Sequence, residues 1–302
     1  MQMTGIFQQL KRSPLHNVLM QVSENELYSV LKQAFEGCGF DAGRYENAAQ
    51  MVLWLQMHGM DGLSLLSASL GQFTNWADQS FAVTESEPNT LLFDMAGQSV
   101  LSTGALVSNL VLAKAADGEL CIGFIRDVQD HAYIAKQLID AQSLGLHGLA
   151  YWQTRTEALE SGTMWQMLRT SVKNDGKKQN TLQELSKDST EKACSFCPCL
   201  ETFNFSLQST DQVGAVAAKD QYQLVLAYAK HRTQLDDVLV KHKEFDKAQL
   251  LATTSAAQSR EKYQYALNNG IEISTELWQK LVELGNNVLV ESNEQSRKGA
   301  GA

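Results

Sequence analysis

Proline and cysteine are both scarce in this chain of 302 residues. The three prolines, Pro14, Pro88 and Pro198, leave most of the sequence free to form long helices, because proline is the residue that most often breaks a helix. The five cysteines are an odd number in a long chain, and this does not resemble the disulfide framework of a secreted domain. We therefore expect reduced thiols.

Basic residues and long apolar runs are also scarce. The net charge is −9, which argues against nucleic acid as a partner, since nucleic-acid binders gather lysine and arginine on one face. The first 20 residues contain no uninterrupted apolar run and no small-residue cleavage site, so neither a signal peptide nor a membrane span is predicted. We expect a globular, cytoplasmic protein with no membrane partner.

Helix signals dominate the N-terminal part of the chain. Ser23 and Glu26 form a capping box, in which each residue can satisfy a backbone amide of the other. Asp41 is expected to cap a second helix, and Gly59 to end it. The expected helices cover residues 24–36, 42–58 and 63–76.

The middle of the chain reads as an alternation of strands and helices. This order predicts an α/β fold, with a mixed sheet flanked by packed N- and C-terminal helices. The expected elements are two short strands within 81–98, a helix over 104–116, a buried strand over 120–125, a helix over 133–144 and a strand over 149–152.

Polar, weakly periodic sequence from about residue 168 predicts a linker or insertion, and regular patterns resume after it. Residues 203–207 alternate as a strand does, 222–228 fit strand or helix, and 241–267 favour a helix. Ser274 or Thr275 should cap a last helix. The expected organisation is an extension (1–21), a helical segment (22–80), an α/β core (81–167), a linker or insertion (168–202) and C-terminal strand and helices that complete the fold (203–302).

The segment from Val22 to Leu66 resembles the N-terminal helices of the type-2 malate/L-lactate dehydrogenase family. In that family the second helix leads into a Gly-x-x-Ser-His-Gly sequence whose histidine transfers a proton. Here the turn reads Gly59-Met60-Asp61-Gly62 and lacks the Ser-His pair. His58, which lies just before the turn, and Asp61 are the catalytic candidates at this place. The resemblance implies a dehydrogenase-like fold, a homodimer and NAD(P) as the cofactor of any retained activity.

Nearly the whole chain from Met20 onward more closely resembles a bacterial family described as a domain of unknown function, whose members look like distant relatives of those dehydrogenases. That family implies a fold and no function. The matching residues are Met20–Ser23, Trp54-Leu55, Gly62-Leu63, Leu277-Trp278, Ser292 and Ser296–Ala302.

Three polar residues form the preferred ligand-binding site. Asp127, Asp130 and His131 follow the buried strand, at the carboxyl end where α/β sheets gather ligands. Capping of the next helix is an alternative role for Asp130. Arg297 in the C-terminal tail could bind an anion, or simply belong to a frayed end. His147 is interpreted as a surface turn residue.

Metal and nucleotide motifs are incomplete or missing. Cys194, Cys197 and Cys199 include a Cys-x2-Cys pair that could reach one zinc ion, but no second pair follows, and we predict reduced cysteines instead of a metal site. His231 and His242 lie too far apart to share an ion. No Gly-rich phosphate loop occurs, so ATP use is unsupported.

These observations leave three functional hypotheses. Because the Ser-His pair is missing, the first is a repurposed or non-catalytic relative, a pseudoenzyme that binds a small metabolite. The second is a working NAD(P)-dependent oxidoreductase that acts on a small 2-hydroxy acid through other residues. The third is a homo-oligomeric interaction module that assembles through its helices.

Overall fold

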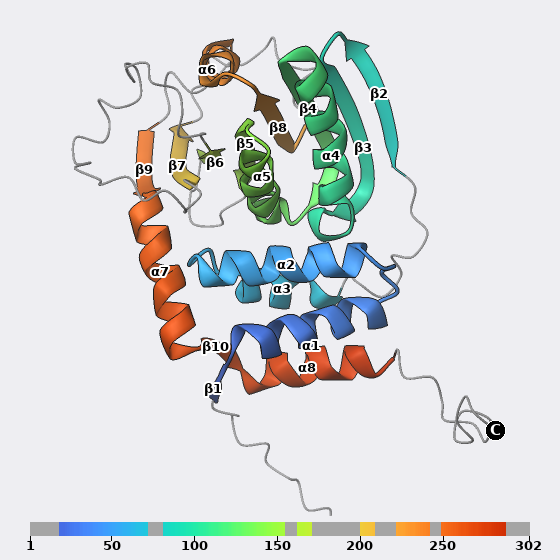
Figure 1. Ribbon diagram of the computed structural model, residues 1–302, viewed down its shortest axis with the longest axis vertical. Helices are drawn as coiled ribbons and strands as arrows, with labels where there is room; N and C mark the ends of the chain where they lie inside the picture. The colour runs from blue at the N-terminus through green and yellow to red at the C-terminus, as the bar shows by residue number, and fades with distance from the viewer. Residues whose placement is uncertain are drawn as a thin grey trace, which may run out of the picture.

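The computed structural model describes residues 18–71, 81–154, 162–170, 200–208, 222–241 and 249–287. Figure 1 shows two parts, a large sheet with helices packed on it and, beneath the sheet, a stack of helices from both ends of the chain. No helix within the described ranges is long and apolar enough to cross a bilayer.

The helical stack begins with α1 (Glu24–Gly37), α2 (Arg44–Met57) and α3 (Gly62–Ser69). The predicted capping box is confirmed, because the Glu26 amide donates to Ser23 Oγ at 3.3 Å and the Ser23 amide donates to the Glu26 carboxylate at 2.8 Å. The prediction that Asp41 caps α2 is wrong. Gly43 occupies the cap position with a φ of 87°, and no side chain bonds to that helix end.

The two ends of the described chain meet in this stack. Strand β1 (Leu19–Val22) pairs antiparallel with β10 (Ile271–Ser274), and α8 (Thr275–Asn286) packs on α1. Ser274 caps α8 by accepting a hydrogen bond from the Leu277 amide, as its sequence position predicted. The expected packing of N-terminal helices against C-terminal helices is therefore confirmed.

The large sheet is mixed, as predicted. Its strand order is β2-β3-β4-β8-β5-β6-β7-β9, and β3 and β4 are its parallel pair, while the other neighbouring strands run antiparallel. The strands are β2 (Ala82–Glu87), β3 (Thr90–Ser99), β4 (Leu120–Gln129), β5 (His147–Thr154), β6 (Gly162–Thr170), β7 (Leu200–Gln208), β8 (Leu224–Ala229) and β9 (Gln249–Thr254).

Helices α4 (Val100–Gly118) and α5 (Ile134–Ser143) join the sheet to the helical stack in one continuous apolar core. In Figure 1 they lie in front of the strands, with α2 and α3 crossing beneath them. A second, smaller core forms where α6 (Arg232–Lys241) places Leu235 and Val238 against residues of β5, β6 and β8. Helix α7 (Ala256–Asn269) connects the sheet to the helical stack (Figure 1).

Several sequence predictions differ from the structure. The helix predicted over 241–267 is interrupted by β9, and α7 begins afresh at Ser255, whose side chain caps it. Residues 168–170, assigned to the linker, belong to β6, whereas 171–199 lie outside the described residues. The interpretation of His147 as a surface turn residue is wrong, because it opens β5 and is only 2% exposed.

Candidate functional site

The carboxyl ends of β3 and β4 are distorted by a bulge. Residues 95–97 of β3 lie opposite the single residue Asp127 of β4, so the register shifts by two positions. Ala96, Gly97 and Asp127 all have positive φ angles, of 49°, 79° and 50°. Left-handed backbone is strained for residues other than glycine, and bulges of this kind redirect the residues that follow them. The bulge therefore determines the direction of the backbone at the carboxyl ends of β3 and β4.

Asp130 lies directly beyond this bulge, also in the left-handed region, with a φ of 58°. Because Ser99 pairs with Gln129 across the two strands, the end of β4 lies beside the N-terminus of α4. Burial raises the pKa of the Asp130 carboxyl above its ordinary value, while hydrogen bonds with Ser99 and Ser69 act to lower it. Oxygen Oδ2 of Asp130 is buried and has no hydrogen-bond partner among the described residues.

His131 is the first residue of a short 3₁₀ turn, His131–Tyr133, that leads into α5. Burial lowers the pKa of its imidazole to about 4, so the ring is neutral at pH 7. Its Nε2 is buried and, within the described part of the chain, unpaired. The ring lies nearly parallel to that of Trp152, at an interplanar angle of 14° and a centroid distance of 6.5 Å.

The turn between α2 and α3 supports this edge of the sheet. The hydroxyl of Tyr133 donates to the carbonyl oxygen of Gly62 at 2.8 Å, and Ser69 at the end of α3 reaches Asp130. A Cβ at position 62 would lie 2.4 Å from the carbonyl oxygen of Val52, so only glycine fits there. The Gly59–Gly62 turn thus places α3, and α3 contributes a polar group to the site.

The two catalytic candidates of this turn are placed differently. His58 is half-buried between the rings of Trp54 and Tyr263, at centroid distances of 4.1 and 5.1 Å, and its Nδ1 lies 2.8 Å from the Trp54 carbonyl oxygen. Burial lowers the pKa of His58 more than that backbone hydrogen bond raises it. Asp61 is exposed, and its side chain makes no capping hydrogen bond to α3. His58 therefore packs α2 against α7.

The predicted ligand-binding residues are only partly brought together. Asp130 and His131 lie side by side in the chain with unpaired buried atoms, while Asp127 is exposed in the bulge. The capping alternative for Asp130 finds no support, since its side chain makes no capping hydrogen bond. Arg297, His242 and the three cysteines Cys194, Cys197 and Cys199 lie outside the described residues. Within those residues, no group of three metal-ligating side chains is present.

Sequence reasoning missed Ser69 and Ser99. Ser99 caps α4 by accepting from the Leu101 amide at 3.0 Å, and a serine between a strand and a helix is a recognisable cap signal. The sequence around Ser69 carries no such signal, because its role depends on how α3 packs.

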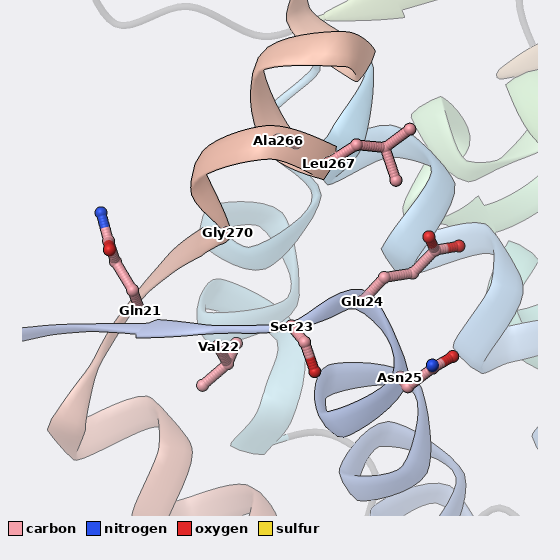
Figure 2. Close-up of a pocket in the computed structure, with 8 residues that line it drawn as sticks. All are labelled: Gln21, Val22, Ser23, Glu24, Asn25, Ala266, Leu267 and Gly270. Carbon is pink, nitrogen blue, oxygen red and sulfur yellow. The ribbon is translucent and has the colours of Figure 1, made fainter.

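A separate pocket of about 410 Å³ opens between the start of α1 and the end of α7 (Figure 2). It is formed by Gln21, Val22, Ser23, Glu24, Asn25, Ala266, Leu267 and Gly270. Ser23 here serves the capping box. The chemistry of the β3–β4 edge, with its unpaired buried groups, makes that edge the stronger candidate site.

A family model matches part of the chain, and solved structures share its fold over most of its length. Residues 22–102 match the model of a family described as "Protein of unknown function (DUF3726)". No curated protein sequence matches the chain significantly.

Solved structures of dehydrogenases share the fold. Malate dehydrogenase from Pyrococcus horikoshii OT3 is 11% identical with a TM-score of 0.58, over 91% of this chain and 97% of that one. A dehydrogenase from Sinorhizobium meliloti is 11% identical with a TM-score of 0.59, over 89% of this chain and 100% of that one. Sulfolactate dehydrogenase from Methanocaldococcus jannaschii is 10% identical with a TM-score of 0.54, over 88% of this chain and 97% of that one. The chain thus combines a segment matching a family of unknown function with a malate/lactate dehydrogenase-like fold, as the resemblance predicted.

Proposed function

We propose that this protein is a cytoplasmic, repurposed relative of the dehydrogenases that binds a small polar metabolite at the carboxyl ends of β3 and β4. One observation carries the proposal: Asp130 Oδ2 and His131 Nε2 are both buried there without a hydrogen-bond partner among the described residues. Leaving a buried polar atom unpaired costs roughly 1–3 kcal/mol. A ligand that supplied the missing hydrogen bonds would recover part of that cost.

The chemistry of the edge suits a hydroxyl, amino or amide group. The neutral imidazole of His131 can accept or donate one hydrogen bond, depending on its tautomer. Asp130 offers an acceptor oxygen that is not committed elsewhere among the described residues. The strained bulge before it is the kind of backbone that clusters at functional sites.

A thermal-shift screen of small polar metabolites against the full chain tests this proposal. We expect a ligand to raise the melting temperature, because binding to the native state stabilises it by mass action. His131→Gln should weaken that response, whereas Asp127→Asn, which changes an exposed side chain of β4, should leave it intact. The proposal fails if no metabolite stabilises the protein, or if stabilisation is the same in His131→Gln.

NAD(P) is the cofactor that the resembled dehydrogenases imply, and the described residues of this edge do not fit its diphosphate. A diphosphate requires basic side chains or a loop of free backbone amides. The edge presents a carboxylate, a neutral imidazole and two hydroxyls. We therefore assign none of these residues to a dinucleotide.

The second candidate function is an oxidoreductase of a small 2-hydroxy acid. It is favoured by His131, because an unpaired neutral imidazole can accept the proton of a substrate hydroxyl. Titration with NADH and NADPH distinguishes the two functions. Absence of any rise in melting temperature at millimolar cofactor would exclude the oxidoreductase, since a native-state ligand must stabilise the fold.

A further inference from the structure

The outer edge of the large sheet is formed by β2. This strand is the first in the sheet order and pairs with β3 alone among the described strands, so the backbone groups on its far side have no strand partner there. Figure 1 shows β2 at the rim of the sheet, beside β3. Its six residues, Ala82–Glu87, are all exposed. An open edge of this kind can pair with a further strand from another chain.

Helix α4 carries an exposed apolar stripe along this edge. Leu106, Leu110 and Lys114 follow one another at intervals of four residues, so they lie on one face of the helix. Lys114 forms an ion pair with Glu85 of β2, which places this face beside the strand. Leu106 is 45% exposed and Leu110 is 38% exposed. Two leucines on successive turns therefore face solvent next to an open strand edge.

Val83 of β2 belongs to the same surface. It lies two positions from Glu85 in the strand, so both side chains point to the same face of the sheet. Because Glu85 reaches Lys114, that face is the one that α4 covers. Val83 also pairs with Phe93, which is part of the core beneath α4, yet Val83 itself is 47% exposed.

The direction of α4 places Leu110 beside Val83. The helix begins where β3 ends, and a Cβ at its last residue, Gly118, would lie 2.6 Å from Asn89 Oδ1 in the β2–β3 turn. Helix α4 therefore runs antiparallel to β3 and parallel to β2. From the ion pair between the two elements, one helix turn back is about 5.4 Å and two strand residues back are about 6.8 Å, so the two apolar side chains lie level with each other.

The other end of this surface is acidic. Glu85 and Glu87 lie near the end of β2, and Asp117 lies on the turn of α4 that follows Lys114. Lys114 neutralises Glu85, whereas Glu87 and Asp117 are exposed and form no ion pair in the part of the chain that the structure describes. A partner strand would thus meet apolar side chains at one end and negative charge at the other.

A second copy of the chain fits this edge poorly. Antiparallel pairing of two β2 strands would bring together four glutamates, two from each copy, and β2 contains no basic residue to offset them. Like charges on paired strands destabilise the pair. A segment with basic residues would instead be attracted to the acidic end, so charge complementarity favours a different partner.

We propose that the β2 edge, meaning the open side of β2 together with Leu106 and Leu110, docks an extended segment of another protein as an added strand. Backbone hydrogen bonds to β2 hold the segment, and its alternate residues contact the α4 side. Those residues are apolar where they meet Val83 and Leu110, and basic where they meet Glu87 and Asp117. The inference is independent of metabolite binding, because it uses none of the residues assigned to that site.

A peptide library tests this chemistry on the full chain. Each fluorescent peptide has nine residues, in which threonine alternates with four variable positions filled by valine, leucine, lysine or glutamate. We expect the tightest binders in a polarisation assay to carry apolar residues in one half and lysines in the other. Replacing both lysines by glutamates should weaken binding roughly 10-fold, because two surface attractions become two repulsions.

Amide hydrogen exchange locates the bound peptide. A peptide that pairs with β2 should slow exchange in residues 82–87, because the added hydrogen bonds protect amides on the open side of the strand. A peptide that packs on α4 without pairing would leave these amides unprotected.

Four variants make the result specific. Leu110→Gln should weaken peptide binding roughly 10-fold, because it removes apolar surface that the peptide covers. Leu144→Gln changes a leucine that is 68% exposed at the end of α5 and should leave binding unchanged. Glu87→Gln should reduce the preference for lysine over glutamate, whereas Glu272→Gln, at an exposed position of β10, should preserve it. Circular dichroism establishes that the variants fold.

The outcomes decide between the possible occupants of the edge. Binding of half-apolar, half-basic peptides that protects β2 and is weakened by Leu110→Gln but not by Leu144→Gln supports the proposal. If no library member binds, or if binding leaves β2 unprotected, the proposal is overturned. A dimeric mass by light scattering that Leu110→Gln converts to a monomeric one would assign the edge to a second copy and overturn it as well.

Discussion

His131 links the stability of the fold to pH. Burial lowers its pKa from the ordinary 6.5 to about 4, so between these values the unfolded chain binds a proton that the folded chain does not. Stability contributed by the neutral ring is therefore present above about pH 6.5 and is lost as the pH falls toward 4. We expect the free energy of unfolding of the wild type to fall by about 1–2 kcal/mol more than that of His131→Gln between pH 7.5 and 5.0.

Urea denaturation at the two pH values measures this difference. Other groups titrate as well: His58 acts in the same direction as His131, and Asp130, whose pKa is raised, acts in the opposite one. Both are present in the wild type and in the variant, so their effects largely cancel. Equal pH dependence in the two proteins would show that His131 is not held neutral by the fold.

The candidate site could be predicted from local sequence only in part. Asp130 and His131 were found because a buried strand ends just before them, and α/β sheets place ligands at such ends. Ser69 comes from a helix about 60 positions earlier in the chain, and the bulge in β3 and β4 arises from pairing between strands. Neither feature has a local signature, because both depend on contacts between distant segments.

At the scale of elements, helix ends were predicted where side chains form caps. Ser23 and Ser274 start their helices through short-range hydrogen bonds that the sequence shows directly. Strand β9 was missed because its neighbours are rich in helix-forming residues, and pairing with β7 outweighs that preference. Intrinsic propensities are weak compared with tertiary pairing, so elements specified by distant partners were the ones mispredicted.

The α2–α3 turn should tolerate no side chain at Gly62. Gly62→Ala places a Cβ within 2.4 Å of the Val52 carbonyl oxygen, and we expect it to destabilise the fold by about 1–3 kcal/mol through overpacking. Gly71→Ala is the matched control, because its Cβ would meet no described residue within 4 Å, and should stay within about 0.5 kcal/mol of wild type. Chemical denaturation compares them, and equal stability of the two variants would contradict the close packing described for this turn.

The ring column of Trp54, His58 and Tyr263 joins α2 to α7. Tyr263→Leu removes the outer ring, and we expect a loss of about 1 kcal/mol beyond the change in buried area. Tyr265→Leu changes a ring on the same helix that is 64% exposed and should have little effect. Amide hydrogen exchange in α7 should accelerate only in Tyr263→Leu. Similar exchange rates in both variants would mean that the stacked rings do not stabilise the packing of α7 on α2.

At the scale of the whole molecule, the segment matched by the family model is not a folding unit. Residues 22–102 include α1, but that helix packs on α8, and β1, which ends at the first residue of the segment, pairs with β10 from the C-terminal part. The two helices approach so closely that a Cβ at Gly37 would lie 1.8 Å from the carbonyl oxygen of Leu284. An α1 without α8 would expose the apolar face that this contact covers.

We therefore expect a fragment of residues 18–119 to remain unfolded, although it contains the whole matched segment. It would lack β4, which pairs with β3 in the full sheet, as well as β10 and α8. Circular dichroism should show no cooperative thermal transition for the fragment, while the full chain gives one. A cooperative transition in the fragment would show instead that the N-terminal helices have a sufficient core of their own, since cooperative unfolding requires a packed native state.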